Sequence, residues 1–301
     1  MSRKYFFFDY DGTLAVYATR TIPASTRECL RLLQEAGHFV AIATGRLQCN
    51  ALDYIENLGI TNIVADGGYS VTRDGQLLWM QGLDLEACKR CLRKLDELDI
   101  PWAVQTANEM LRHTPYQRFD DLAGDYYVPT QVDPGLSIDA LQEVFKIYIP
   151  CAEEDTDALL ATGVLDGMPW VRYKSHTIFV EPMDKALGIK KMMDLLGAPY
   201  NDVVVFGDGK NDISMFIPEW TSIAMGNAKP QLKERADYVT AAVEDDGIMK
   251  ACRHFGWIAS SKRGRPLQAG SGRPRLRQRV CERAYLPWAA RMAASSSAYS
   301  S

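Results

Sequence analysis

The chain has 301 residues, 47% of them hydrophobic and 24% charged, which is the composition of a globular protein long enough for two domains. Its net charge of −4 is unevenly distributed: residues 259–301 hold nine Lys or Arg and one acid, so the remaining body is strongly acidic, which argues against general nucleic-acid binding through the folded part. The early apolar runs are too short for a bilayer span or a secretory signal, so we predict a cytoplasmic protein without membrane association.

Strands and helices alternate over the first 80 residues. The pattern predicts, in chain order, a strand at 4–9, a helix at 25–36, a strand at 38–43, a helix at about 47–58, a strand at 62–65, and a hairpin of 69–72 and 76–80 around Asp74-Gly75. The alternation returns with a helix at 186–196 and a strand at 203–206. Such alternation predicts βαβ units and a mainly parallel sheet.

The middle of the chain has a different pattern, with paired strands and fewer helices. We expect a helical stripe from Leu85 to Leu98, a second helix near 155–161, and strands at 102–106, 110–114, 144–149, 170–174 and 177–180. The predicted fold is therefore α/β: a Rossmann-like, doubly wound parallel sheet forms the core, and an α+β cap is inserted into it. We assign residues 1–82 and 183–258 to the core, 83–182 to the cap and 259–301 to a basic tail without a folded unit.

Polar residues follow three of the predicted core strands. The segments are Asp9-Tyr10-Asp11-Gly12-Thr13, Thr44-Gly45-Arg46, and Gly207-Asp208-Gly209-Lys210-Asn211-Asp212. Ligands of open parallel sheets bind beyond the carboxyl ends of the strands, so neighbouring strands would bring these segments into one pocket. Four carboxylates in that pocket, those of Asp9, Asp11, Asp208 and Asp212, would repel one another unless a cation neutralised them. Oxygen ligands favour Mg²⁺, and the glycines can present backbone N–H groups to an anion.

These motifs resemble those of the haloacid dehalogenase superfamily. Asp9-Tyr10-Asp11-Gly12-Thr13-Leu14 matches its DxDGT(L/V) signature, and Thr44-Gly45-Arg46, Lys185 and residues 207–212 look like its second, third and fourth motifs in the right order. The long insert before Lys185 and the segment Ala224-Met225-Gly226-Asn227-Ala228 are similar to those of the Cof-like, type IIB phosphatases. The resemblance covers the core, and over the cap it rests on position and pattern alone. Tyr10 and Asp66 depart from the residues that are commoner in the family.

The resemblance implies an Mg²⁺-dependent phosphatase, a phosphoric monoester hydrolase that acts on small phosphorylated metabolites, with sugar phosphates as the leading class. Asp9 would be the nucleophile that forms an aspartyl-phosphate, and Asp11 the general acid and then the base. The roles implied for the other residues form two groups. Asp9, the backbone carbonyl of Asp11, and Asp208 would ligate Mg²⁺ with Asp212 as a water-mediated or supporting ligand, and Thr44, Gly45, Lys185 and Asn211 would hold the phosphoryl group.

Other interpretations of the sequence stay open. Some phosphomannomutases resemble this core and cap arrangement, so a phosphomutase is the alternative enzyme. The basic tail could bind RNA or an anionic membrane, and a regulatory protein without turnover is a third possibility. Arg46 could pair with a surface acid. Cys88 and Cys91 have zinc-like spacing but lack further ligand residues nearby, so we interpret them as thiols.

Overall fold

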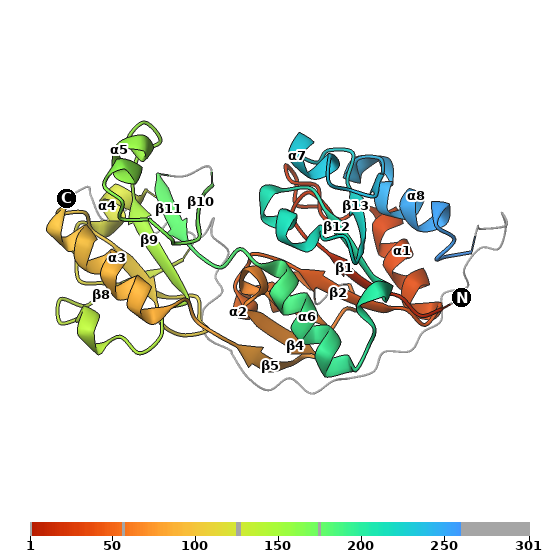
Figure 1. Ribbon diagram of the computed structural model, residues 1–301, viewed down its shortest axis with the longest axis horizontal. Coiled ribbons are helices and arrows are strands. Elements are labelled where there is room, and N and C mark those ends of the chain that lie inside the picture. Colours follow the sequence, from red (N-terminus) through yellow and green to blue (C-terminus); the bar gives the residue numbers. More distant parts are fainter. Residues whose placement is uncertain (1, 56–57, 125–127, 174–175, 260–301) are drawn as a thin grey trace, which may run out of the picture. The chain divides into compact units, whose positions relative to one another are not determined.

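The computed structural model describes residues 2–55, 58–124, 128–173 and 176–259. Two β-sheets organise this part of the chain, as Figure 1 shows. One sheet is built from strands near both ends of the described chain, and the other from strands between them. The predicted basic tail lies outside the described residues, apart from its first residue.

The core sheet has eight strands in the order β14-β13-β12-β1-β2-β3-β4-β5. Their bounds are β1 Tyr5–Phe8, β2 Phe39–Ala43, β3 Ile63–Ala65, β4 Ser70–Arg73, β5 Gln76–Met80, β12 Val203–Gly207, β13 Thr221–Ala224 and β14 Tyr238–Val239. The six strands from β14 to β3 are parallel, whereas β4 and β5 pair antiparallel. Asp74 and Gly75 join β4 to β5 with positive φ angles of 51° and 77°, as a tight hairpin turn requires.

The central strands of the core sheet are buried along nearly their whole length. Every residue of β2 and β12 is buried, and so are Phe6, Phe7 and Phe8 of β1. Strands that are covered on both faces need apolar side chains at successive positions, and these runs of Phe, Val, Ile and Ala meet that need. The buried central strands therefore form a well-packed support for the predicted site residues, which follow them in the chain.

Helices flank the core sheet. Their bounds are α1 Ala24–Glu35, α2 Gln48–Ile55, α6 Lys185–Leu196, α7 Pro230–Lys233 and α8 Gly247–His254, with short 3₁₀ segments at η1 Asp66–Gly68, η3 Tyr200–Asp202, η4 Lys210–Met215 and η5 Val243–Asp245. α1 packs beside α8, and α6 packs along β3 and β4 (Figure 1). The Asp184 carboxylate caps α6 by accepting from the Leu187 N–H at 3.1 Å, and Gly197 ends the helix in a left-handed conformation. The segment after β12 forms a six-residue 3₁₀ helix, η4.

The cap sheet has six strands in the order β10-β11-β9-β6-β7-β8. The cap elements are α3 Leu85–Glu97, β6 Ala103–Gln105, β7 Arg112–Thr114, α4 Phe119–Ala123, β8 Thr130–Val132, η2 Ile138–Ala140, β9 Lys146–Pro150, α5 Thr156–Ala161, β10 Trp170–Arg172 and β11 Thr177–Val180. Cys88, Cys91 and Leu92 of α3 join Ile147 and Ile149 of β9 in one hydrophobic cluster. Both cysteines are buried free thiols, which agrees with the interpretation from sequence.

Two short cap elements were missing from the sequence-based prediction. β8 has three residues and pairs in parallel with β7, and α4 has five residues. Neither is long enough for a period of 2 or 3.6 residues to stand out from the surrounding sequence. Within the described residues, the structure contains no helix with both the length and the apolarity that a membrane crossing requires.

Candidate active site

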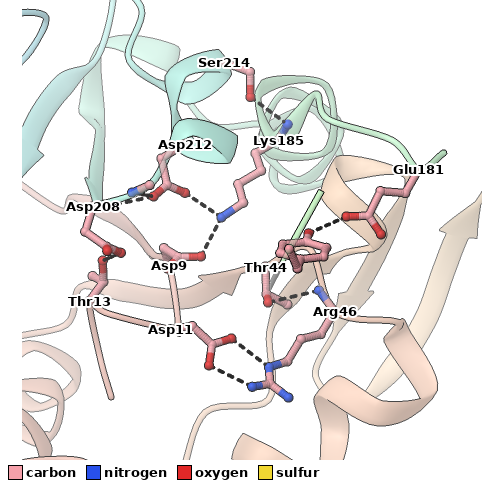
Figure 2. A network of polar contacts seen from close by, with 12 residues as sticks. Asp9, Asp11, Thr13, Thr44, Arg46, Glu181, Lys185, Asp208, Asp212 and Ser214 are labelled. Atoms are coloured by element: carbon pink, nitrogen blue, oxygen red, sulfur yellow. Dashed lines mark hydrogen bonds and ion pairs between the residues drawn. The ribbon is translucent and has the colours of Figure 1, made fainter. Parts of the chain in front are cut away.

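The carboxyl ends of three neighbouring parallel strands bring the predicted site residues together. β1 lies between β2 and β12, with Phe8 in register with Ile42 on one side and with Phe206 on the other. Because all three strands run in the same direction, the residues that follow them emerge at one edge of the sheet. Figure 2 shows the resulting network, in which most side chains come from the segments after these strands and from the start of α6, while Glu181 follows β11.

Lys185 lies at the centre of this network. Its side chain has no solvent exposure, and its Nζ lies 2.6 Å from Asp9 Oδ1 and 2.6 Å from Asp212 Oδ1 (Figure 2). Burial acts against the charged ammonium, but the two carboxylates outweigh it and raise the pKa of Lys185. Lys185 is thus held as a cation between two acids, Asp9 and Asp212, that are 203 residues apart in the sequence.

Lys185 reaches this position because α6 begins directly at the sheet edge. Its backbone N–H donates to Ser214 Oγ at 3.0 Å. The preceding segment also packs closely against η1: a β-carbon on Gly68 would lie 1.9 Å from the carbonyl oxygen of Asp184. Gly68 has a φ of 108°, so both the close approach and the backbone conformation require glycine there.

Three carboxylates form a cluster that could hold a metal ion. Ligand oxygens of Asp9, Asp208 and Asp212 lie within 4.8 Å of one another. Burial, reinforced by the charge of Asp212, raises the pKa of Asp9 well above its ordinary value, and the same causes raise the pKa of Asp208 to about 7. If all three acids are ionised, the single ammonium of Lys185 leaves two negative charges uncompensated. An all-oxygen donor set with this excess charge fits a hard divalent cation such as Mg²⁺.

The three carboxylates are not equally free to bind a cation. Asp212 uses Oδ1 for Lys185, and its Oδ2 accepts from the backbone N–H groups of Asp208 at 2.9 Å and Gly209 at 2.8 Å. Among the described residues, the hydrogen bond that Asp208 Oδ1 accepts is a longer one, of 3.1 Å, from the Thr13 hydroxyl. The geometry therefore favours Asp9 and Asp208 as direct ligands and Asp212 as the residue that holds the loop.

The loop after β1 approaches Asp208 more closely than a side chain would allow. A β-carbon on Gly12 would lie 2.3 Å from Asp208 Oδ2, and Gly12 has a φ of 91°. The carbonyl oxygen of Gly12 accepts a 2.8 Å hydrogen bond from the Asn227 amide, whose Oδ1 in turn accepts from Val243 N. Thr13 and Asn227 were quoted in the motifs without a role, because sequence alone does not say which loop each would contact.

Arg46 contacts the second acid of the first motif. Its Nε donates to Asp11 Oδ2 at 2.9 Å, and its Nη2 donates to Asp11 Oδ1 at 2.7 Å (Figure 2). The Asp11 side chain thereby points toward Arg46 and is not among the three clustered carboxylates. The acid with which Arg46 pairs is Asp11 of the first motif, whose side chain is partly exposed.

The other predicted phosphate-binding residues, Thr44, Gly45 and Asn211, lie in or beside the loop that follows β2. Thr44 is buried, and its hydroxyl accepts from Arg46 N at 3.2 Å. The position of a β-carbon on Gly45 would be 3.9 Å from the side-chain amide nitrogen of Asn211 and 3.8 Å from the hydroxyl of Tyr173. Tyr173 belongs to the cap, and no sequence motif singled it out.

Comparisons with known proteins identify the family of the chain. The family model of the haloacid dehalogenase-like hydrolases matches residues 6–252. The chain belongs to this family. YkrA of Bacillus subtilis is 34% identical over 262 residues, which cover 86% of this chain and all of YkrA. The 5-amino-6-(5-phospho-D-ribitylamino)uracil phosphatase YitU of the same organism is 27% identical over 82% of this chain and 95% of its own length.

A solved structure of a related protein has a similar fold. The subclass IIB sugar phosphatase BT4131 of the haloacid dehalogenase superfamily aligns with a TM-score of 0.67 and 29% identity, over 85% of this chain and all of that one. The predicted family, its Cof-like type IIB kind, the Rossmann-like core with an inserted α+β cap, and the enzyme type, a phosphoric monoester hydrolase, are confirmed.

Proposed function

We propose that this haloacid dehalogenase-type enzyme is an Mg²⁺-dependent phosphatase that hydrolyses small phosphorylated metabolites through an aspartyl-phosphate on Asp9. The observation that carries the proposal is the buried bridge from Lys185 to Asp9 and Asp212 beside Asp208. Buried charges of this kind are expensive to maintain and are expected where chemistry requires them.

The proposed reaction has two chemical steps, formation and hydrolysis of the aspartyl-phosphate, and residues of this chain act in both. In the first step, an Asp9 carboxylate oxygen attacks phosphorus, and the bond to the leaving oxygen breaks while Asp11 gives that oxygen a proton. In the second step, Asp11 takes a proton from water, which attacks the phosphorus of the aspartyl-phosphate and releases Asp9. The Lys185 ammonium and the Thr44 and Asn211 side chains would hold the phosphoryl oxygens during both steps.

Asp9, Asp208 and the backbone carbonyl of Asp11 would hold Mg²⁺, with Asp212 supporting the loop. When bound, the cation would favour the ionised form of Asp9 and offset charge on the phosphoryl group. Bound Mg²⁺ would also neutralise the two negative charges that remain in the buried cluster when all three carboxylates are ionised and Lys185 offsets one of them.

Sugar and polyol monophosphates are the substrate class that we propose. YitU is named for a substrate with a phosphorylated ribityl chain, and BT4131 is named a sugar phosphatase. Both names describe those proteins and support the same class here. We propose the cytoplasm as the place of action, where such metabolites are found.

The test is phosphate release from a panel of about a hundred phosphorylated metabolites, with Mg²⁺ and with a chelator. Asp9→Asn should abolish release, while the control Asp202→Asn, which removes a partly exposed partner of Lys4, should not. Unchanged turnover by Asp9→Asn would reject the proposal. Product analysis with a hexose 1-phosphate separates the alternative: free phosphate supports hydrolysis, and a rearranged sugar phosphate supports a phosphomutase.

A further inference from the structure

Tyr173 brings a cap hydroxyl to the loop that follows β2. The residue directly follows β10, and its hydroxyl lies 3.8 Å from the position that a β-carbon on Gly45 would occupy. The Asn211 amide lies 3.9 Å from that same position. A residue of the inserted cap therefore lies beside Gly45, one of the proposed phosphate-binding residues, although no motif of the family marks it.

A buried ion pair fixes the orientation of this hydroxyl. Tyr173 donates its phenolic proton to Glu181 Oε1, and Glu181 Oε2 pairs with Lys146 Nζ. Glu181 and Lys146 are both buried, with exposed fractions of 3% and 7%. The Tyr173 ring also packs edge-on against Phe179, with centroids 5.3 Å apart. An ion pair buried in this way adds little net stability compared with apolar residues, but it gives the phenol one defined acceptor.

The hydrogen-bonding capacity that remains on Tyr173 is that of an acceptor. A phenol has one proton to donate, and here Glu181 receives it. Burial and the charge of Glu181 raise the pKa of Tyr173, so the phenol keeps this proton at neutral pH. Phosphoryl oxygens are acceptors too and cannot bond to the free lone pair. The group that Tyr173 can bind is a donor on the organic part of the substrate.

Part of the Tyr173 residue is open to solvent. It is 45% exposed, whereas Glu181, which accepts its proton, and Lys146, which pairs with Glu181, are buried. We propose that Tyr173 is a specificity-determining residue, whose hydroxyl oxygen accepts a hydrogen bond from a substrate hydroxyl near the phosphate ester. The enzyme then prefers polyol monophosphates to alkyl monophosphates of the same length. This inference rests on the proposed phosphatase function, but it can be tested without turnover.

The experiment measures binding to an Asp9→Asn background by titration calorimetry with Mg²⁺ present. The ligands are sorbitol phosphate, hexyl phosphate and inorganic phosphate. Adding Tyr173→Phe should weaken sorbitol phosphate binding about tenfold, the effect of one lost neutral hydrogen bond, and leave the other two affinities unchanged. The matched control is Tyr200→Phe, which removes a tyrosine hydroxyl that donates to Asp194 at 2.5 Å on the exposed surface of η3. It should change none of the three affinities.

Two results would overturn the inference. One is an unchanged affinity for sorbitol phosphate in Tyr173→Phe, and the other is an equal loss for sorbitol and hexyl phosphates, which would mean that the residue only supports the cap. The failure of the proposed function looks different, because wild-type protein would then release no phosphate from any ester while the binding difference persisted. Absence of binding by all three ligands would reject both ideas.

Discussion

Arg46 binds both carboxylate oxygens of Asp11, at 2.9 Å through Nε and at 2.7 Å through Nη2. This two-point contact fixes the direction of the carboxylate as well as its position. An acid that serves first as a proton donor and then as a base must meet the leaving oxygen and later the water at the same place. Arg46 is therefore expected to hold the ionised Asp11 in position, and one of its two hydrogen bonds must open when Asp11 carries a proton.

Arg46→Lys should lower kcat/KM about tenfold for alkyl phosphates, because lysine keeps the charge but loses the two-point geometry. Asp11→Asn should lower it by about a hundredfold to ten-thousandfold. Both losses should be smaller with p-nitrophenyl phosphate, whose leaving group needs little protonation. The control Arg31→Lys changes an arginine that binds both oxygens of Glu28 on the exposed face of α1, and it should have no effect. Equal losses for both kinds of leaving group would contradict the positioning role.

Lys185 should contribute strongly to stability, since its removal leaves two buried acids without their cation. Lys185→Met is expected to lower the free energy of unfolding by about 3–5 kcal/mol in urea titrations without Mg²⁺. Adding Asp212→Asn to that variant should recover part of the loss, because one of the unpaired charges disappears. Lys190→Met alters an exposed lysine on the same helix and should change stability by less than about 0.5 kcal/mol. A loss no larger than that of the Lys190 variant would disprove the structural role of the bridge.

Asp208 should determine whether Mg²⁺ stabilises the protein. A ligand that binds only the folded state raises the melting temperature, so Mg²⁺ should raise the Tm of the wild type. In Asp208→Asn this rise should be abolished or strongly reduced, while the metal-free protein stays folded because repulsion within the cluster is relieved. Differential scanning calorimetry with and without Mg²⁺ measures both quantities, and Asp202→Asn again serves as the control. An undiminished Mg²⁺ effect in Asp208→Asn would place the ion elsewhere.

Asp66 should make stability depend on pH. Burial raises its pKa to about 6, although hydrogen bonds from Ser70 and Gln48 N and the charge of Lys146 act in the opposite direction. Glu181 adds a smaller raising effect. Because the folded-state pKa exceeds the unfolded one, its contribution to stability is fully present below about pH 4 and is lost as pH rises through about 6.

Asp66→Asn should remove this pH dependence. Asparagine can accept the same two hydrogen bonds and suits the positive φ of 50° at this position. Urea titrations should show that the variant is more stable than the wild type at pH 8, by at most about 3 kcal/mol, and that the difference vanishes near pH 4. A constant difference between pH 4 and pH 8 would show that Asp66 does not titrate in this range.

The sequence was most informative where chemistry and strand pattern coincide. The runs that became β1, β2 and β12 are continuous and apolar, so both the strands and the edge where Asp9, Thr44 and Asp208 emerge could be predicted. A place for Lys185 in the site followed only from the family resemblance, because a lysine in a first helical turn is usually exposed. Its contacts with Asp9 and Asp212 were not predicted.

The rest depends on tertiary contacts that leave no local pattern. The orientation of Asp11 toward Arg46 is decided by side-chain geometry, which spacing along the chain does not encode. Tyr173 lies near Gly45 through the placement of a cap hairpin, and its partner Glu181 pairs in turn with Lys146 on another strand, β9. The three-residue β8 gains its structure from pairing with β7 and is too short to be recognised alone.

The central claim is that Asp9 is the group that takes up phosphate. Its most direct test is peptide mass spectrometry after an acid quench during turnover with Mg²⁺, using Asp11→Asn so that the second step is slow. The expected result is the added mass of one phosphoryl group on the peptide that contains Asp9, and its absence when Asp9→Asn is combined with Asp11→Asn. Phosphate release without any modification of that peptide, at a rate that Asp9→Asn leaves unchanged, would contradict it.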